Sequence, residues 1–215
     1  MRPIEITWLG HSCFRLKGKE VTLITDPYDA SIGYALGKPK ANIVTSSHPH
    51  PGHGFVAGVG GGPKIVRGPG EYEIASVFIT GIATFHDAEK GKRRGKNTVY
   101  LIEMDELTLC HLGDLGHSLS SEQVEELSGV EVLMVPVGGL STIDAATAAE
   151  IVRQLQPRVV IPMHFKTDAV AFKLEPVATF FKEMGLKGSS PQPRLVLTRS
   201  TLPDEAQVVV LDYRS

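Results

Sequence analysis

The sequence contains little cysteine and no long apolar run. Cys13 and Cys110 are the two cysteines among 215 residues, which argues against a disulfide framework and favours free thiols in a reducing compartment. No apolar stretch approaches the roughly 18 residues that a membrane span needs, and the first residues lack the apolar centre of a signal peptide. We therefore expect a cytoplasmic protein without a membrane partner.

An excess of charge of either sign is also absent. The 22 basic and 24 acidic side chains give a formal net charge of -2, so no overall field would recruit nucleic acid. No repeat, linker or low-complexity block divides the chain, and we expect residues 1–215 to form a single domain. Any function must therefore reside in a local cluster of residues.

The first half of the chain is predicted to be mainly extended. Short apolar or alternating runs are bounded there by glycine, proline and charged residues, which is the pattern of strands and turns. The predicted strands cover 4–9, 13–16, 21–25, 41–45, 65–67, 70–74, 76–85, 98–104 and 107–112.

Helices are predicted only in the second half. Ser120 and Gln123 form a capping box for a helix that runs to Leu127. An apolar face over 144–156 predicts a second helix, which ends before a proline. The stripe of a third helix, closed by a glycine, consists of Leu174, Val177, Phe181 and Met184. Strands are expected at 130–137, 159–161, 195–198 and 208–211.

Three histidines follow the predicted strand at 41–45 within six residues. His48 and His50 lie two positions apart, so an extended turn places both rings on one side, and His53 follows one turn later. Imidazole nitrogen is a common ligand of zinc. The cluster therefore indicates a metal site, although a polar surface loop with three histidines by chance is the simpler alternative.

Other metal-ligand side chains follow further predicted strands. His86 comes after the strand at 76–85, Asp114 after the strand at 107–112, and His164 after the strand at 159–161. Because strand ends cluster at one rim of a sheet, these side chains could meet the histidines at 48–53.

Six stretches together resemble the metallo-β-lactamase superfamily, across essentially the whole chain. They are 7–12 (TWLGHS), 25–27 (TDP), 47–53 (SHPHPGH), 85–87 (FHD), 111–114 (HLGD) and 162–165 (PMHF). The variant is similar to the branch of small hydrolase-like proteins related to ascorbate-6-phosphate lactonase. The resemblance implies an α/β fold, the αββα four-layer sandwich, with a metal site on the shared edge of two sheets.

The resemblance also implies a ligand set for two metal ions. Two such ions share a water whose pKa falls toward neutrality, so the chemistry needs no nucleophilic side chain. Asp114 and His53 would then serve catalysis through this activated water. The implied ligands are His48, His50 and His86 for the first ion, Asp114 as the bridge, and His53 with His164 for the second.

One position departs from the family pattern. The superfamily writes His-x-His-x-Asp-His, whereas the aspartate position here is Gly52. We therefore expect one tight metal site and a second site that is weak or empty. Zinc is the expected metal, with manganese or iron as alternatives, because histidine and carboxylate ligands suit all three.

Residues around the ligands have expected roles as well. His11 and Asp26 are expected to hydrogen-bond to metal-bound histidines. Lys166 and His117 are expected to contact the substrate. The basic stretch 90–96 could bind an anionic group, but a solvated, mobile hairpin tip is the favoured reading.

The leading hypothesis is a metal-dependent hydrolase that cleaves an ester-like, lactone or phosphoester bond in a small-molecule substrate. A first alternative is a degenerate superfamily member that binds metal or ligand with little or no turnover, because of the glycine at position 52. A second is a ribonuclease-like enzyme, against which the near-neutral charge argues.

Overall fold

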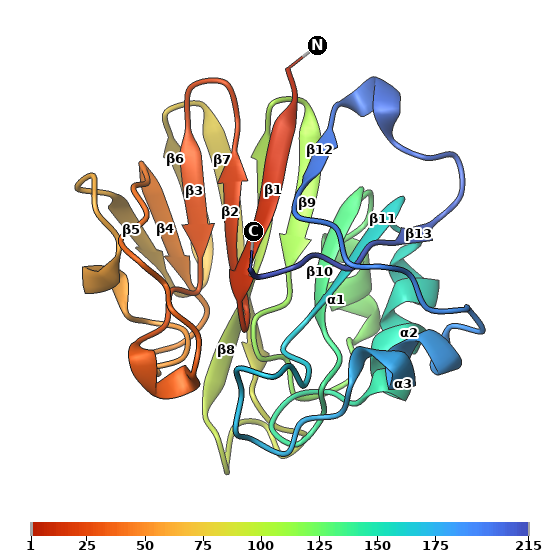
Figure 1. The fold of residues 1–215 in the computed structure, drawn as a ribbon. Coiled ribbons are helices and arrows are strands. Elements are labelled where there is room, and N and C mark those ends of the chain that lie inside the picture. Colours follow the sequence, from red (N-terminus) through yellow and green to blue (C-terminus); the bar gives the residue numbers. More distant parts are fainter. Residues whose placement is uncertain (1, 215) are drawn as a thin grey trace.

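Two β-sheets face each other in the computed structural model, which describes residues 2–214 (Figure 1). In spatial order the six-stranded sheet contains β12 (Leu195–Leu197), β1 (Ile4–Gly10), β2 (Cys13–Lys17), β3 (Thr22–Thr25), β4 (Ile43–Ser46) and β5 (Lys64–Arg67). The seven-stranded sheet contains β13 (Gln207–Val208), β11 (Val159–Met163), β10 (Val132–Pro136), β9 (Leu107–His111), β8 (Lys96–Met104), β7 (Val77–Phe85) and β6 (Gly70–Ile74).

Three α-helices lie beside the seven-stranded sheet (Figure 1). They are α1 (Ser121–Glu126), α2 (Ala145–Leu155) and α3 (Val177–Glu183), and the short 3-10 turns are η1 (Ala30–Ile32), η2 (Val56–Gly58) and η3 (Arg199–Thr201). The predicted capping box at Ser120 is present, with both of its hydrogen bonds. In the part of the chain that is described, no helix is long and apolar enough to cross a bilayer.

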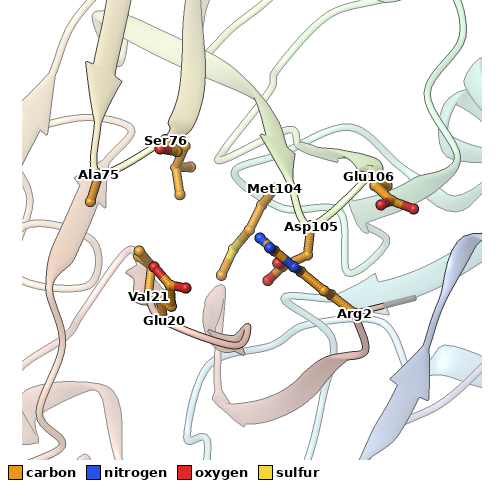
Figure 2. A pocket seen from close by; sticks show the side chains of 9 residues that line it. Arg2, Glu20, Val21, Ala75, Ser76, Met104, Asp105 and Glu106 are labelled. Carbon is orange, nitrogen blue, oxygen red and sulfur yellow. The ribbon is translucent and has the colours of Figure 1, made fainter.

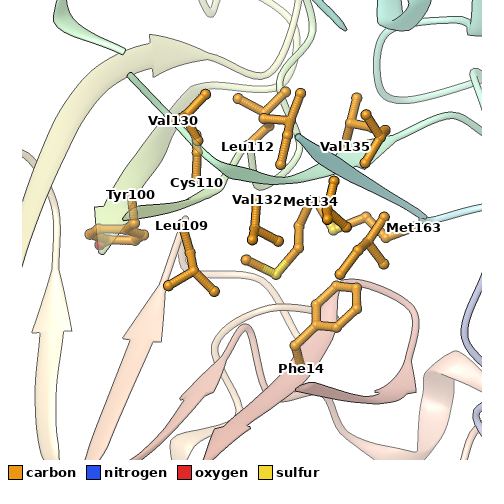
Figure 3. Packing of buried hydrophobic residues seen from close by; sticks show 14 of the residues in the cluster. Phe14, Tyr100, Leu109, Cys110, Leu112, Val130, Val132, Met134, Val135 and Met163 are labelled. Carbon is orange, nitrogen blue, oxygen red and sulfur yellow. The ribbon is translucent and has the colours of Figure 1, made fainter. Parts of the chain in front are cut away.

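The space between the sheets is filled by apolar side chains (Figure 3). Phe14 of β2 points toward Met134 of β10 and Met163 of β11. Trp8 of β1 is 2% exposed. Every residue of β10 and β11 is buried, as expected for strands covered on both faces. Burial of this apolar surface fixes the two sheets against each other.

Side chains along the strands of the six-stranded sheet point alternately to its two faces, and those on the outer face form a second, smaller core. Cys13, Ile24 and Val44 pack there with Tyr28 and Ile32 from the segment around η1. Their sequence neighbours point the other way, into the main core, because successive strand residues face opposite sides of a sheet. The predicted sandwich is therefore confirmed, with an outer layer on this side built from η1 and loops.

Several predicted boundaries differ from the structure. Leu174 lies outside α3, because Pro176 is the N-cap residue of that helix, and it packs in the smaller core instead. The predicted strand at 208–211 is reduced to β13, and Leu211 forms an isolated bridge with Gln192. The strand predicted to end at 161 continues through Pro162, where β11 pairs with β10 and no longer with β13.

The strand directions bring distant parts of the sequence to one rim. β3 and β4 are parallel, and so are β9, β10 and β11. β7 runs in the same direction as β9, because both are antiparallel to β8. Hydrogen bonds from the Thr98 N–H to the Ser47 carbonyl and from the His164 N–H to the His11 carbonyl join these ends of the two sheets. The segments that follow β3, β4, β7, β9 and β11 therefore lie at the same end of the sandwich.

Candidate metal centre

Asp114, which follows β9, lies at the centre of a buried cluster of histidines. Its Oδ2 atom is 3.0 Å from Nε2 of His53 and 3.3 Å from Nε2 of His86. Its Oδ1 atom is 3.6 Å from Nε2 of His164. The backbone N–H of Asp114 donates to Oδ1 of Asn97 over 2.9 Å. A carboxylate is thus surrounded by imidazoles from the ends of three different strands.

His48 and His50 complete the cluster from the segment after β4. The ring centroid of His48 is 5.7 Å from that of His50 and 4.9 Å from that of His86. Three sets of residues have ligand atoms within 4.8 Å of one another, the separation that a common ion requires. These sets are His48, His50 and His53; His48, His86 and Asp114; and His11, His53 and His164.

Several polar atoms in this cluster are buried without a hydrogen-bond partner among residues 2–214. They include Nε2 of His48, Oδ1 of Asp114, and Nδ1 of His11, His86 and His164. A buried polar atom without a partner is destabilising and calls for an explanation, such as a bound ion. Nitrogen and carboxylate donors are also the atoms that zinc and similar metals take as ligands. The residues present therefore fit a divalent metal.

Asp26, which follows β3, orients one of these histidines. Its Oδ2 atom lies 2.8 Å from Nδ1 of His53 and accepts a hydrogen bond from the Ser47 hydroxyl over 2.6 Å. Its Oδ1 atom accepts from the Ser47 backbone N–H over 2.7 Å. A proton on Nδ1 of His53 is thereby held toward Asp26, and Nε2 is left facing Asp114.

Charge interactions keep both carboxylates ionised. Burial would raise the pKa of Asp114, but the neighbouring His53 and His164 hold it well below the usual value. Burial would also raise the pKa of Asp26, and the hydrogen bond from His53 lowers it. The pKa of His53, which burial would lower, is raised to about 10 chiefly by Asp114. The two anions therefore flank His53 on both ring nitrogens.

The remaining histidines are held as neutral imidazoles. Burial lowers the pKa of His48 to about 4. Burial likewise lowers the pKa values of His50, His86 and His164. A neutral ring retains the nitrogen lone pair that a metal needs, so these four histidines can ligate an ion as they stand, whereas His53 would have to release a proton.

Ser47 and Asn97 contribute to the site without having been predicted. Ser47 holds Asp26 and also lies 3.1 Å from Nδ1 of His48 through its hydroxyl. Asn97 binds the backbone of Asp114, 17 residues away. The position of Ser47 directly before the histidines was an available signal, whereas the sequence around Asn97 carries none.

The two residues predicted to contact substrate are engaged elsewhere. Nε2 of His117 accepts a hydrogen bond from the Phe85 backbone N–H over 3.1 Å. The Lys166 ammonium group donates to the backbone carbonyls of Val170 and Phe172. Neither residue lines the two cavities, of about 200 and 540 Å³, that lie beside the histidines. Their contact with substrate stays a prediction.

The basic loop that follows His86 is mostly exposed, as expected, and its backbone is hydrogen-bonded to Asp87. Asp87 accepts four backbone hydrogen bonds of 2.8 to 3.0 Å, from residues 89, 91, 93 and 94. Burial would raise the pKa of Asp87, and these N–H donors lower it below its usual value. The bonds hold the backbone of Arg94 beside the histidines, and the mobility of the basic side chains stays a prediction.

Three cavities adjoin the cluster. One of about 200 Å³ contains Asp114 and His164, with Leu140 and Phe172 in its wall. A second of about 540 Å³ is lined by His48, Pro49, His50, His86, Arg94, Gly95 and Lys96. The third, an apolar pouch of about 580 Å³ that also contains Phe85 and Arg67, shares His48, Pro49 and Lys96 with the second. The cluster thus opens onto space for a small molecule.

A separate cavity of about 260 Å³ has different chemistry (Figure 2). Its wall is formed by strand-connecting turns and includes Arg2, Glu20, Asp105 and Glu106. These turns lie where β3, β7 and β9 begin, whereas the histidines and Asp114 lie where β4, β7, β9 and β11 end. The lining contains no histidine, and this cavity is not part of the metal centre.

Comparison with known proteins agrees with this geometry. Residues 5–164 match the family described as the beta-lactamase superfamily domain. The chain belongs to the metallo-β-lactamase superfamily. Among its superfamily relatives is a UPF0173 metal-dependent hydrolase of Pyrococcus horikoshii, 29% identical over 76% of this chain and 85% of the relative. Another, from Thermoplasma acidophilum, is 28% identical over 78% of this chain and 85% of the relative.

A solved superfamily structure is also similar. The crystal structure of a metallo-β-lactamase superfamily protein from Thermotoga maritima matches with a TM-score of 0.80 and 38% identity, over 97% of this chain and 98% of that one. The predicted superfamily and fold are therefore confirmed. The finer relation to ascorbate-6-phosphate lactonase stays a prediction.

Proposed function

We propose that this member of the metallo-β-lactamase superfamily is a metal-dependent hydrolase that cleaves an ester-like, lactone or phosphoester bond in a small metabolite. The observation that carries the proposal is the convergence of one buried carboxylate and histidines from separate strand ends beside an open cavity. The UPF0173 relatives are themselves named metal-dependent hydrolases.

The proposed ligand assignment is the one that the superfamily resemblance implies, and the three converging sets agree with it only in part, because none of them contains both His50 and His86. His48, His50 and His86 would hold the first ion and Asp114 would lie between the two sites. The second site, with His53 and His164, would be the weaker of the two. Bound ions of this kind supply a Lewis acid and lower the pKa of water toward neutrality.

The chain's own residues prepare this chemistry. Asp26 holds the Nδ1 proton of His53, so the proton that a metal ion would displace is the one on Nε2. The low pKa of Asp114 keeps its oxygens unprotonated as acceptors. Ser47 is not a free nucleophile, because it is 3% exposed and its hydroxyl donates to Asp26. Water is therefore the expected attacking group.

The cavity walls suggest the kind of substrate. Arg94 and Lys96 line the cavity beside His48 and His86, where they would bind an anionic group by charge-assisted hydrogen bonds. The adjoining pouch, with Phe85 in its wall, would take an apolar part of the same molecule. A cavity of about 540 Å³ is in the usual range for small ligands.

Zinc is the proposed metal, with manganese or iron as alternatives. The donors are mainly imidazoles, which suit zinc and iron better than harder cations. We further propose a single domain that acts in the cytoplasm without a nucleic-acid or membrane partner, because the 22 basic and 24 acidic side chains nearly balance and the sequence has no apolar stretch of about 18 residues.

The test is hydrolysis of a panel of lactones, phosphodiesters, phosphomonoesters and β-lactams by protein loaded with zinc, manganese or iron. Activity of the wild type that is lost in His48→Ala, at unchanged thermal stability of the metal-free protein, supports the proposal. A wild type that binds metal but is inactive throughout, beside an active Gly52→Asp variant, would contradict it and favour a degenerate, ligand-binding role.

A further inference from the structure

His11 lies in the turn between β1 and β2, and its backbone is fixed to the metal centre. Its carbonyl accepts a hydrogen bond from the Trp8 indole N–H over 2.9 Å and from the His164 backbone N–H over 3.1 Å. The residue is 4% exposed. The second bond ties it directly to the segment that follows β11, so the rings of His11 and His164 cannot move apart freely.

The ring of His11 faces the histidines of the second site rather than a carboxylate or carbonyl. Its centroid is 4.2 Å from that of His164 and 4.9 Å from that of His53. Nδ1 of His11 is buried without a hydrogen-bond partner among the described residues. A histidine that merely orients a ligand would use its ring nitrogens to bond to that ligand or to a carboxylate, and the structure records no such bond for His11.

Gly52 leaves space for this ring. The backbone of Gly52 lies outside the left-handed region, so its conformation does not require glycine. A Cβ at this position would instead lie 3.2 Å from Nε2 of His11, 3.2 Å from Nδ1 of His50 and 3.1 Å from Cδ1 of Ile32. Contacts this short would crowd the neighbouring atoms. Any side chain at position 52 would therefore compete with His11 for the same space.

We infer that His11, His53 and His164 form a three-histidine metal site, in which His11 is a ligand rather than a supporting residue. Their ligand atoms all lie within 4.8 Å of one another. The inference rests on the proposed function, because it assumes that the cluster binds metal. Three imidazoles with Asp114 nearby carry little negative charge, so this site should prefer zinc, iron or cobalt to manganese.

The test measures metal binding rather than turnover. Wild type, His11→Asn and the control Gln156→Asn are titrated with zinc against a chromophoric chelator, and bound metal is counted by mass spectrometry. Asparagine is chosen because His11 has a φ of 53°, which asparagine tolerates. Gln156 has a φ of 48°, is exposed at the C-terminal end of α2 and belongs to none of the three ligand sets.

We expect two zinc ions per chain in wild type and in Gln156→Asn. His11→Asn should weaken the second by at least about tenfold, as loss of a metal-site partner does, and leave the first unchanged. Two ions bound by His11→Asn at wild-type affinity would overturn the inference. One ion per wild-type chain would also overturn it but leave the proposed function standing, whereas no bound metal would contradict both.

A second measurement needs no substitution. Nuclear magnetic resonance of the ¹⁵N-labelled wild type, followed through the second zinc equivalent, reports on each histidine ring. A ring nitrogen of His11 should shift to the metal-bound range with that equivalent. A His11 ring that stays unchanged while His53 and His164 shift would contradict the inference.

Discussion

Replacement of Asp26 by asparagine should impair metal binding while preserving the shape of the site. Oδ1 of Asp26 accepts from the Ser47 backbone N–H over 2.7 Å, and this donor requires that the asparagine oxygen take the same place. The asparagine NH₂ would then face Nδ1 of His53, where Asp26 has an acceptor at 2.8 Å. Two donors cannot face each other, so Nδ1 must lose its proton and Nε2 must carry it.

The consequence falls on the nitrogen that faces Asp114. Nε2 of His53 lies 3.0 Å from Oδ2 of Asp114, and a protonated Nε2 cannot ligate a metal. Changes to groups that orient metal ligands typically lower metal affinity by 10- to 100-fold, which is about 1.4 to 2.7 kcal/mol. We expect a loss of this size for the second ion.

The assay is a competitive zinc titration of wild type, Asp26→Asn and the control Asp204→Asn. Asp204 is an exposed carboxylate before β13, which pairs with the first residues of β11 and not with its histidine end, so its substitution should leave the affinity for zinc unchanged. Unfolding of the metal-free proteins shows whether Asp26→Asn still folds. Wild-type zinc affinity in a folded Asp26→Asn variant would refute the reasoning.

Three further results are expected. Asp144→Ala, which removes the N-cap of α2, should reduce the free energy of unfolding by about 1 kcal/mol at pH 7. The cap hydrogen bonds lower the pKa of Asp144. The stability that this carboxylate contributes is therefore present above its unfolded-state pKa and is lost as the pH falls through the folded-state value. Denaturant titrations should show the stability difference between wild type and Asp144→Ala shrinking below about pH 4. Burial raises the pKa values of Cys13 and Cys110, so a thiol reagent at pH 8 should label neither in the native protein and both in denaturant, and rapid native labelling would contradict their burial. Arg94→Ala or Lys96→Ala should raise KM for an anionic substrate about tenfold, the effect of a charge-assisted hydrogen bond of about 1.5 kcal/mol, and an unchanged KM in both would place the anionic group elsewhere.

The strands and the positions of the proposed metal ligands were predictable from the sequence. Apolar runs between turn residues locate the strands, and the placement of His86, Asp114 and His164 after such runs follows from the same pattern. The predicted strand at 159–161 ends two residues too early. β11 continues through Pro162 because β13 pairs only with Val159 and Val160, which the sequence does not show. Propensity describes one strand at a time, whereas pairing depends on its neighbours.

Contacts between distant residues were not predictable. The bond from the Asp114 backbone to Asn97 and the four N–H groups on Asp87 depend on how loops meet. Both oxygens of Asp87 accept hydrogen bonds from the basic loop. Such side-chain to backbone bonds leave no periodic trace in a sequence.

The most direct test of the account is anomalous X-ray scattering from a crystal of the zinc-loaded protein. The account predicts a strong peak about 2.0 to 2.1 Å from a ring nitrogen of each of His48, His50 and His86, on the side of Asp114. Protein that takes up zinc but shows its anomalous peak away from these residues would contradict the central claim.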